Sequence, residues 1–224
     1  MDEKVQTGSA VFDELLEGGY EKGVLTTIYG PPGSGKTTTC LLSAIAQPKQ
    51  KKIIFMDTEG GFSTSRLKQL SKDYRSVLER TFIIRPTSFE LQKNAVEQIQ
   101  KLVSPRFGII ICDTISALYR TERGPDNKAL NKELSRQLTS LLEIARTKNI
   151  PVLLTNQVYS DFDDKSSIKM VGGDIINYSS KCLIELGMLS GNARQATLRK
   201  HRSLPEKTGL FRIEEQGFSQ VKNQ

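Results

Sequence analysis

Short apolar runs alternate with amphipathic stretches along most of the chain. The interiors of these runs are almost continuously apolar, which is typical of parallel strands covered on both faces. Five runs of this kind are predicted as strands: Val24–Tyr29, Lys52–Asp57, Thr81–Ile84, Gly108–Cys112 and Pro151–Thr155. Between them, Ser88–Val103 and Asn131–Lys148 repeat apolar residues every three or four positions, as helices with one buried face do. Ser88 suits an N-cap.

The alternation of strands and helices favours an α/β fold with a largely parallel central sheet flanked by helices. After Gly173 the pattern changes to short strands separated by polar turns: "CLIEL", "ATLRK", "GLFRIE" and "GFSQV". They predict a C-terminal antiparallel meander that closes one side of the sheet. The chain shows no internal repeat, low-complexity tract or linker, so we expect a single domain over residues 1–224.

Composition places the chain among ordinary globular proteins, with 37% hydrophobic and 25% charged residues among 224. No apolar run approaches the roughly 18 residues of a membrane span, and the N-terminus lacks a secretory h-region. The three cysteines lie far apart among apolar neighbours, which predicts buried free thiols in a reducing, cytoplasmic setting. One histidine and no paired cysteines give no support to a zinc site.

The net charge of +7 favours anionic partners such as nucleic acid or nucleotide. Bulk charge alone is weak evidence, so its distribution matters more. Its densest part is the stretch 194–207, with five Lys or Arg, one His and a single Glu.

"YGPPGSGKTT" is the sharpest chemical signal, since it matches the P-loop pattern G-x-x-x-x-G-K-[ST] between a predicted strand and a predicted helix. Glycines let backbone N–H groups surround phosphate oxygens, and the helix N-terminus adds partial positive charge. Lys36 is expected to reach the β- and γ-phosphates of ATP, and Thr37 to offer its hydroxyl to Mg²⁺. The nucleotide-binding candidates are Gly30, Pro31, Pro32, Gly33, Ser34, Gly35, Lys36, Thr37 and Thr38.

Three polar residues at the ends of other apolar strands complete this site. Asp113 directly follows "GIIIC" and is a candidate second Mg²⁺ anchor; the alternative is a helix-capping acid. Glu59, before two glycines, is a candidate base for the attacking water; the alternative is a solvated loop acid. Gln157 is a candidate γ-phosphate sensor; the alternative is an ordinary strand-end residue. Parallel strands end on one edge, so these side chains can meet there.

The segment "TNQVYSDFDDKSSIKMVGGD", Thr155–Asp174, raises a separate question. We expect the strand to end at the Asn156-Gln157 pair and a loop of more than a dozen residues to follow. The loop 158–171 holds three aspartates against two lysines on a basic protein. We interpret it as a γ-phosphate-sensing flap that tempers DNA binding or presents an acidic face to another protein; the alternative is a solvated loop without a role.

Taken in order, five motifs resemble the ATPase cores of the RecA/RadA recombinase family: "TGSAVFDELLEGGYEKGVLTTIYGPPGSGKTT", "DTEGGFSTSRL", "CDTISALYR", "TNQV" and "VGGDIINYSS". The resemblance covers about Thr7 to Phe218. It implies Lys36 and Thr37 on the nucleotide and Mg²⁺, with Asp113 as the Walker B acid. It also implies Glu59 as catalytic base and Gln157 as the residue that heads the second DNA-facing loop.

The same resemblance implies a first DNA-facing loop at Tyr119–Leu130, with Arg120 and Arg123 as phosphate contacts. Arg66 falls where the family often has an arginine near the nucleotide base; the alternative is a surface helix residue. The basic "KHRSLPE" is most similar to an archaeal paralogue of RadA.

The sequence departs from the family's full recombinases in two ways, one that bears on assembly and one that bears on DNA binding. Only 29 residues precede Gly30, so we expect no N-terminal helix-hairpin-helix domain. The linker motif Phe-x-x-Ala is also absent, because Phe12 begins "FDEL". We therefore expect a monomer or small homo-oligomer rather than a filament built by linker docking. The acidic loop is the second departure, since relatives use that loop to grip DNA.

DNA affinity is largely counterion release, so we expect it to come chiefly from Arg199, Lys200 and Arg202. The alternatives are that Lys200 and Arg202 reach ATP across a subunit interface, or that they are merely solvated. The favoured function is an ATP- and DNA-binding accessory protein of recombination and repair with weak ATPase activity. Its partner would be the RadA recombinase or a Holliday-junction enzyme. The alternatives are an autonomous DNA-dependent recombinase and a KaiC-like signalling ATPase without nucleic acid.

Overall fold

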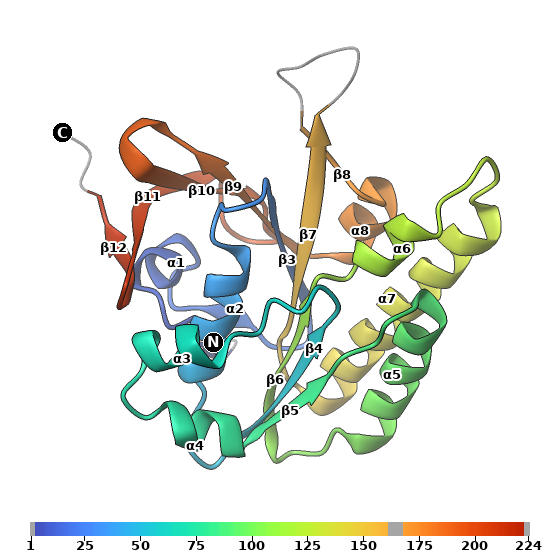
Figure 1. The fold of residues 1–224 in the computed structure, drawn as a ribbon, viewed down its shortest axis with the longest axis horizontal. Helices are drawn as coiled ribbons and strands as arrows, with labels where there is room; N and C mark the ends of the chain where they lie inside the picture. The colour runs from blue at the N-terminus through green and yellow to red at the C-terminus, as the bar shows by residue number, and fades with distance from the viewer. Residues whose placement is uncertain (1–2, 161–167, 222–224) are drawn as a thin grey trace.

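A computed structural model describes residues 3–160 and 168–221. Among these residues, ten strands form one sheet whose order is β12-β11-β10-β9-β3-β7-β6-β4-β5, with β8 paired to β7 (Figure 1). These strands are β3 Leu25–Gly30, β4 Lys52–Asp57, β5 Thr81–Ile84, β6 Phe107–Asp113, β7 Val152–Ser160, β8 Ile168–Met170, β9 Cys182–Met188, β10 Ala193–Lys200, β11 Lys207–Glu214 and β12 Gly217–Gln220. A separate pair, β1 Lys4–Val5 and β2 Tyr20–Glu21, lies outside it.

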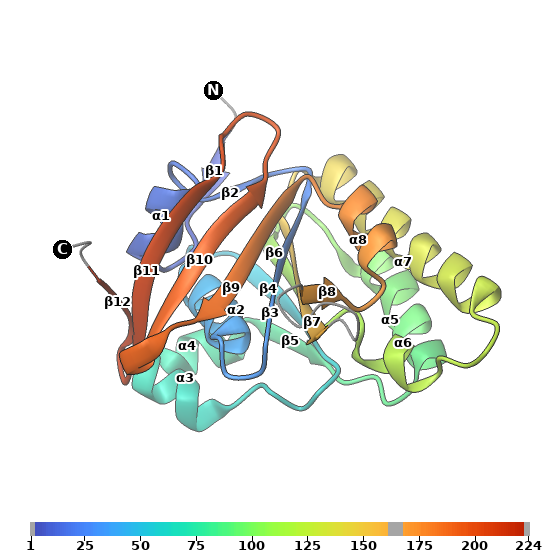
Figure 2. The same cartoon turned by 90° about the horizontal axis from the view of Figure 1, so that it is seen from above.

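The central strands are parallel, and the C-terminal ones form an antiparallel meander, so the predicted α/β fold is confirmed. Figure 2 shows β9, β10 and β11 side by side next to β3. Helices lie on both faces: α1 Ala10–Leu15, α2 Lys36–Ile45, α3 Thr64–Leu70, α4 Tyr74–Glu79, α5 Phe89–Leu102, α6 Ala117–Thr121, α7 Lys128–Lys148 and α8 Gly173–Ser179. A short 3₁₀ turn, Ser190–Asn192, joins β9 to β10.

Two hydrophobic cores hold these helices, one on each face of the sheet. The first packs α1 and α2 onto residues such as Ile28, Phe55 and Ile111. The second packs α5 and α7 onto Ile54 and Ile110. Neighbouring residues of one strand therefore enter opposite cores, which is why β4 and β6 are apolar along nearly their whole length.

Local signals set several boundaries. The Ser88 hydroxyl accepts a hydrogen bond from the N–H of Leu91 at 3.2 Å, so the predicted N-cap of α5 is confirmed. Helix α7 begins at Lys128, three residues before the predicted Asn131. All three cysteines are free and buried, as expected; burial raises the pKa of Cys182 to about 12.

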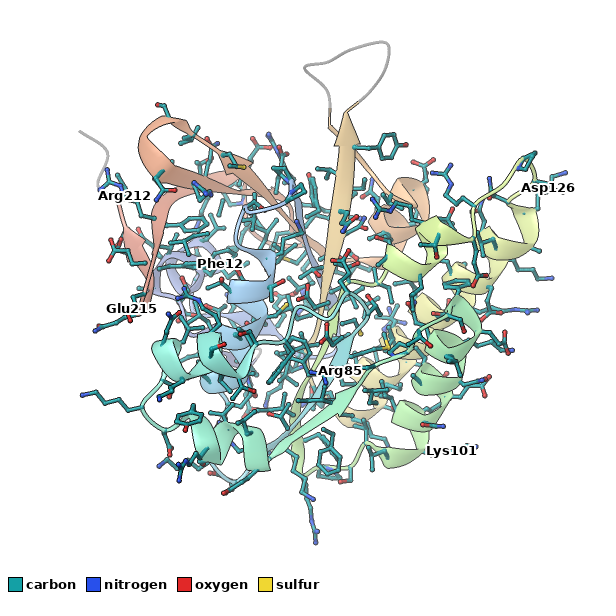
Figure 3. The ribbon with its side chains drawn as sticks, viewed as in Figure 1. Phe12, Arg85, Lys101, Asp126, Arg212 and Glu215 are labelled. Atoms are coloured by element: carbon teal, nitrogen blue, oxygen red, sulfur yellow. The ribbon has the colours of Figure 1, made fainter. Side chains whose placement is uncertain are left out.

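Phe12 belongs to this interior. Its ring lies 5.9 Å from that of Phe218 and 6.0 Å from that of Phe211, inside the meander. Figure 3 shows Phe12 in the interior, whereas Arg212 and Glu215 lie at the outer margin. The two apolar residues of "FDEL", Phe12 and Leu15, are thus part of the core.

The predicted end of β7 is wrong. The strand continues past the Asn156-Gln157 pair to Ser160 and forms an antiparallel pair with β8. Val158 pairs with Met170, and Val and Tyr at 158–159 are strong strand formers, so the ladder extends beyond the core. Residues 158–160 and 168–170 of the expected loop therefore form an antiparallel strand pair, called the β7–β8 hairpin below; Asp161, Asp163, Asp164 and Lys165 lie outside the described residues.

The segment expected as the first DNA-facing loop, Tyr119–Leu130, is also more regular than predicted. Its first residues belong to α6 and its last to α7, which leaves 122–127 between the helices. Tyr119 is buried and its hydroxyl donates to Asn131 Oδ1 at 2.6 Å, so packing anchors the start of this segment.

Candidate nucleotide-binding site

The carboxyl ends of β3, β4, β6 and β7 gather the polar residues of the site at one edge of the sheet. Gly30, at the end of β3, pairs directly with Gln157 of β7. Asp57 of β4 pairs directly with Asp113 of β6. Parallel register thus brings together residues that are more than 50 positions apart in the sequence.

The turn between β3 and α2 has the backbone of a phosphate cradle. Gly33 and Gly35 have φ angles of +75° and +110°, a region that favours glycine. A Cβ added at Gly33 would meet no atom within 4 Å, so this part of the turn faces open space. Gly35 is the N-cap of α2 and no side chain caps it, so the first helical N–H groups beside the turn are available to a ligand.

Lys36 is buried beneath this turn, with 9% of its surface exposed. Its Nζ donates hydrogen bonds to the carbonyl oxygens of Gly30 at 2.7 Å and Pro31 at 2.9 Å. Burial lowers the pKa of the lysine, and the nearby carboxyl groups of Asp113 and Glu59 oppose that effect. The ammonium group is held at the base of the cradle by neutral acceptors.

Asp113 is almost fully buried, and its Oδ1 accepts a hydrogen bond of 2.5 Å from the Thr155 hydroxyl. Burial raises the pKa of this carboxyl group, while hydrogen bonds from Thr155 and Thr37 lower it. A Cβ added at Gly61 would lie 3.4 Å from Thr37 Oγ1 and 3.6 Å from Asp113 Oδ2. Thr37, Asp113 and the Gly61 backbone therefore form one compact group.

Sequence reasoning did not single out Asp57, the acid beside this group. Its Oδ1 accepts from the N–H of Gly61 at 2.8 Å, and its Oδ2 pairs with Arg85 Nε at 3.3 Å. The carboxyl group thereby fixes the turn that carries Glu59. Its position at the carboxyl end of a buried strand is the signal that could have found it.

Glu59 and Gln157 are in direct contact: the Gln157 amide donates a hydrogen bond to Glu59 Oε1. Glu59 is solvent-exposed as a residue, yet the protein around its carboxyl group removes hydration and raises its pKa. Asp113 raises this pKa further, and Lys36 and Arg120 lower it. The candidate base and the candidate sensor thus form one unit.

Gln157 connects this unit to the β7–β8 hairpin. Its carbonyl oxygen accepts from the N–H of Val171 at 3.1 Å, just after β8. Next to it, the Asn156 amide donates to the Val171 carbonyl at 3.0 Å, and Ser116 donates to Asn156 Oδ1. A displacement of Gln157 would therefore be transmitted to both strands of the hairpin.

Arg194, at the start of β10, is a residue of this site that sequence reasoning missed. It is 9% exposed, and its Nε donates to the carbonyl oxygen of Gly33 at 3.1 Å. The two-residue alternation of Arg194, Ala196 and Leu198 is the signal, since the other two members are buried. The DNA-binding candidates of this stretch, Arg199, Lys200 and Arg202, lie elsewhere, as described below.

The comparisons with known proteins agree with this geometry. The family model "Rad51" matches residues 3–221. The chain belongs to the Rad51 family. It is 41% identical to the DNA repair and recombination protein RadB of Methanobrevibacter smithii, over 96% of this chain and 95% of that protein.

RadB of Methanocaldococcus jannaschii is 39% identical, over 92% of this chain and 97% of that protein. A solved structure described as the crystal structure of the RadB recombinase matches with a TM-score of 0.84 and 36% identity. The match covers 97% of this chain and the whole chain of the solved structure. The resemblance to archaeal RadB is therefore confirmed over nearly the full length.

The residues fit the ATP and Mg²⁺ that Rad51-family proteins typically use. The cradle is open at Gly33, Lys36 is held at its base, and Thr37 lies beside Asp113. A hydroxyl oxygen and a carboxylate are the hard donors that Mg²⁺ prefers. Pro31 and Pro32 shape the turn, and Ser34 is fully buried within it; Thr38 follows on the first turn of α2.

Arg66 lies on α3, where its guanidinium group contacts the turn between β11 and β12. It donates to the carbonyl oxygens of Glu214 at 2.7 Å and Glu215 at 2.9 Å, and to Gln69 Oε1 at 2.9 Å. The arginine thus ties α3 to the meander. A role beside the nucleotide base stays a prediction.

The DNA-binding candidates fall into two groups. Arg120 is exposed on α6 and close enough to Glu59 to lower its pKa. Arg123 is exposed after α6, at the rim of a small pocket shared with Tyr159 and Gly172. Arg123 thus shares this pocket with residues of both β7 and β8, Tyr159 and Met170.

The C-terminal group makes contacts within the protein. Arg199 pairs with Glu185 at 2.7 Å and with Glu206 at 2.8 Å. Lys200 Nζ donates to the Asn177 carbonyl at 2.6 Å, and burial lowers its pKa. Arg202 pairs with Glu21 at 2.9 Å. Carboxylates thus neutralise part of the charge that the sequence shows as basic.

None of the helices in the described ranges is long and apolar enough to span a membrane.

Proposed function

We propose that this protein is an ATP- and DNA-binding accessory protein of homologous recombination and repair, with slow ATPase activity. The observation that carries the proposal is the convergence of Lys36, Thr37, Asp113 and the Glu59–Gln157 pair at one edge of the sheet. The RadB relatives support the biological setting, since their names state DNA repair and recombination.

In this proposal Lys36 neutralises the β- and γ-phosphates, and Thr37 and Asp113 hold Mg²⁺. The metal ion would stabilise charge that develops on the transferred phosphoryl group. Glu59 orients and deprotonates the attacking water, which requires its carboxylate form. The resting contact with Gln157 keeps Glu59 in place until a nucleotide competes for the amide.

Gln157 would report the γ-phosphate to the hairpin. An amide that turns from Glu59 toward a phosphate oxygen changes its own backbone contact with Val171. Because Val171 follows β8, the hairpin would respond to the bound nucleotide. In this way the γ-phosphate-sensing flap would respond to ATP. The flap in turn would temper DNA binding or engage a protein partner.

DNA is the proposed macromolecular ligand, met by Arg120 and Arg123 and by the C-terminal group Arg199, Lys200 and Arg202. The proposed protein partner is the RadA recombinase or a Holliday-junction enzyme. We further propose that residues 1–224 act as a single ATPase domain, as a monomer or small homo-oligomer in the cytoplasm. The packing of Phe12 into the core favours this over linker docking through "FDEL".

Two other functions remain distinct candidates. The related crystal structure is described as that of a RadB recombinase, which favours an autonomous strand-exchange filament as the second. A KaiC-like signalling ATPase without nucleic acid is the third, and the Rad51-family match does not favour it.

Electron microscopy with ATP, with and without DNA, separates the three functions. An accessory protein gives small complexes on DNA, a recombinase gives continuous filaments on DNA, and a signalling ATPase gives rings that form without DNA. Calorimetric titration of the same preparation with Mg²⁺–ATP tests the nucleotide site independently. Absence of ATP binding to the folded wild-type protein would refute the site itself.

A further inference from the structure

Arg194 is a buried cation directly behind the phosphate cradle. Besides its bond to Gly33, its guanidinium group donates to Asn192 Oδ1 at 3.3 Å and to the Ala193 carbonyl at 3.1 Å. All three acceptors are neutral. No ion pair among the residues that the structure describes includes Arg194.

A buried guanidinium group without a carboxylate is unusual because desolvation of its charge is expensive. Arg199, five residues later on the same strand, shows the usual solution, since two carboxylates surround it. Lys36 is the only other buried lysine or arginine in the described residues, and it too donates to cradle carbonyls. Two such cations behind one open turn indicate a site that is completed by a polyanion.

The meander supports the cradle on the same side as Arg194. A Cβ added at Gly30 would come within 2.5 Å of the Leu186 carbonyl oxygen of β9. A Cβ at Gly35 would come within 3.2 Å of Ile213 and 3.3 Å of Phe218, from β11 and β12. The cradle therefore rests on four strands of the meander, and the position of Arg194 relative to it is fixed.

We propose that Arg194 is a positioning residue for the phosphates of the nucleotide. The carbonyl of Gly33 and the N–H of Ser34 belong to one planar peptide group, and that N–H donates to the Pro31 carbonyl at 3.3 Å. The Arg194 hydrogen bond therefore helps to fix the conformation of the turn that surrounds the phosphates. It also polarises the peptide and places a permanent positive charge behind the cradle. This inference rests on the proposed nucleotide-binding function and adds a residue from the C-terminal meander to it.

The test compares Arg194→Gln and Arg194→Lys with the matched control Arg212→Gln. Arg212 belongs to the same meander but is exposed on β11. Binding of ATP and ADP is measured by calorimetry, and stability by urea unfolding without nucleotide. We expect Arg194→Gln to weaken ATP binding by roughly 10-fold or more, the usual scale for a lost charge-assisted hydrogen bond.

The loss should be smaller for ADP, which carries less charge, and Arg194→Lys should restore much of the ATP affinity. Arg212→Gln should bind both nucleotides as the wild type does. A folded Arg194→Gln protein whose ATP affinity stays within twofold of wild type would overturn the inference while leaving the proposed function intact. Equal losses for ATP and ADP in both Arg194 variants, with a lower unfolding midpoint, would also overturn it by showing a purely structural role.

A second variant covers the case in which Arg194→Gln does not fold. Asn192→Gly removes one acceptor of the guanidinium group and is compatible with the positive φ of that position, 62°. The arginine charge is kept but its orientation is loosened. We expect a twofold to fivefold loss of ATP affinity at unchanged stability, and unchanged ATP affinity would count against the positioning role.

Discussion

Two groups of cations on this protein have opposite surroundings. At the cradle, Lys36 and Arg194 are buried and donate only to carbonyl and amide oxygens. In the C-terminal group, Arg199 and Arg202 are more exposed and pair with carboxylates. The densest basic stretch of the sequence, 194–207, contains Arg194 as well as the C-terminal group, yet Arg194 donates to neutral oxygens and Arg199 to carboxylates. Charge available to a ligand therefore depends on partners, and density along the chain does not reveal them.

Among the cations of the two groups, Lys36 is expected to give the largest effect on ATP binding. Lys36→Ala removes the buried ammonium group at the base of the cradle and should weaken ATP binding by at least about 100-fold. Lys200→Ala serves as the matched control in the C-terminal group, with ATP affinity near that of wild type. Calorimetry on both variants decides the matter. Normal ATP binding by folded Lys36→Ala would mean that the cradle does not hold phosphates, and a large loss in Lys200→Ala would indicate a nucleotide contact across a subunit interface.

Glu59 tests turnover separately from binding. Glu59→Gln keeps the shape and the Gln157 contact but removes the base, so hydrolysis should fall by roughly 10²-fold while ATP still binds. Steady-state phosphate release and calorimetry give the two readouts. Glu79→Gln, an acid at the end of α4 just before the amino end of β5, is the matched control. Normal hydrolysis by Glu59→Gln would assign the base to another residue.

The raised pKa of Glu59 adds a pH dependence. A base works only when ionised, so acidification should reduce turnover as pH falls through this raised pKa, above the range of an ordinary glutamate. Its first cause is desolvation, and the neighbouring Asp113 adds to it. A pH–rate profile of the wild type, with the ATP concentration saturating, measures the position of this acidic limb. A limb at the ordinary glutamate value would show that the Glu59 carboxyl group is well hydrated during turnover.

The C-terminal group should give a moderate effect on DNA. Lys200→Ala/Arg202→Ala should weaken binding and flatten its salt dependence by roughly one to two units of slope, since fewer phosphates would be neutralised. Fluorescence anisotropy over a series of salt concentrations measures both. Arg120→Ala/Arg123→Ala provides the parallel test of the other group. An unchanged slope in the first double variant would place the main DNA surface at Arg120 and Arg123.

Removal of acids should give the smallest effects, with the opposite sign. Glu185→Gln/Glu206→Gln would free Arg199, and we expect DNA affinity to rise a few-fold with about one added unit of salt slope. Asp161→Asn/Asp163→Asn/Asp164→Asn, outside the described residues, should leave DNA binding equal or stronger. The same anisotropy assay applies. A loss of DNA binding in the loop variant, with a normal C-terminal double variant, would reverse the proposed DNA surface.

The α/β architecture and the P-loop could be predicted from local patterns along the chain. Continuous apolar runs gave the central strands because a strand buried on both faces has no polar side to display. The spacing of Gly30, Gly35 and Lys36 predicted the cradle because a tight turn before a helix needs those residue types locally. Asp113, Glu59 and Gln157 were found as polar residues that follow apolar strands, and parallel register explains why they meet.

Features that depend on residues far away in the sequence could not be predicted from local patterns. The continuation of β7 beyond Gln157 requires β8 as a partner, and a strand without its ladder is not visible in a local pattern. The same holds for charge. Arg194 and Arg199 are both arginines of one short strand, but one lies behind the cradle and the other between two carboxylates. The side-chain alternation of β10 and the segments that pack against it cause this difference. Only the fold determines which charged or polar groups lie within hydrogen-bond distance of each arginine.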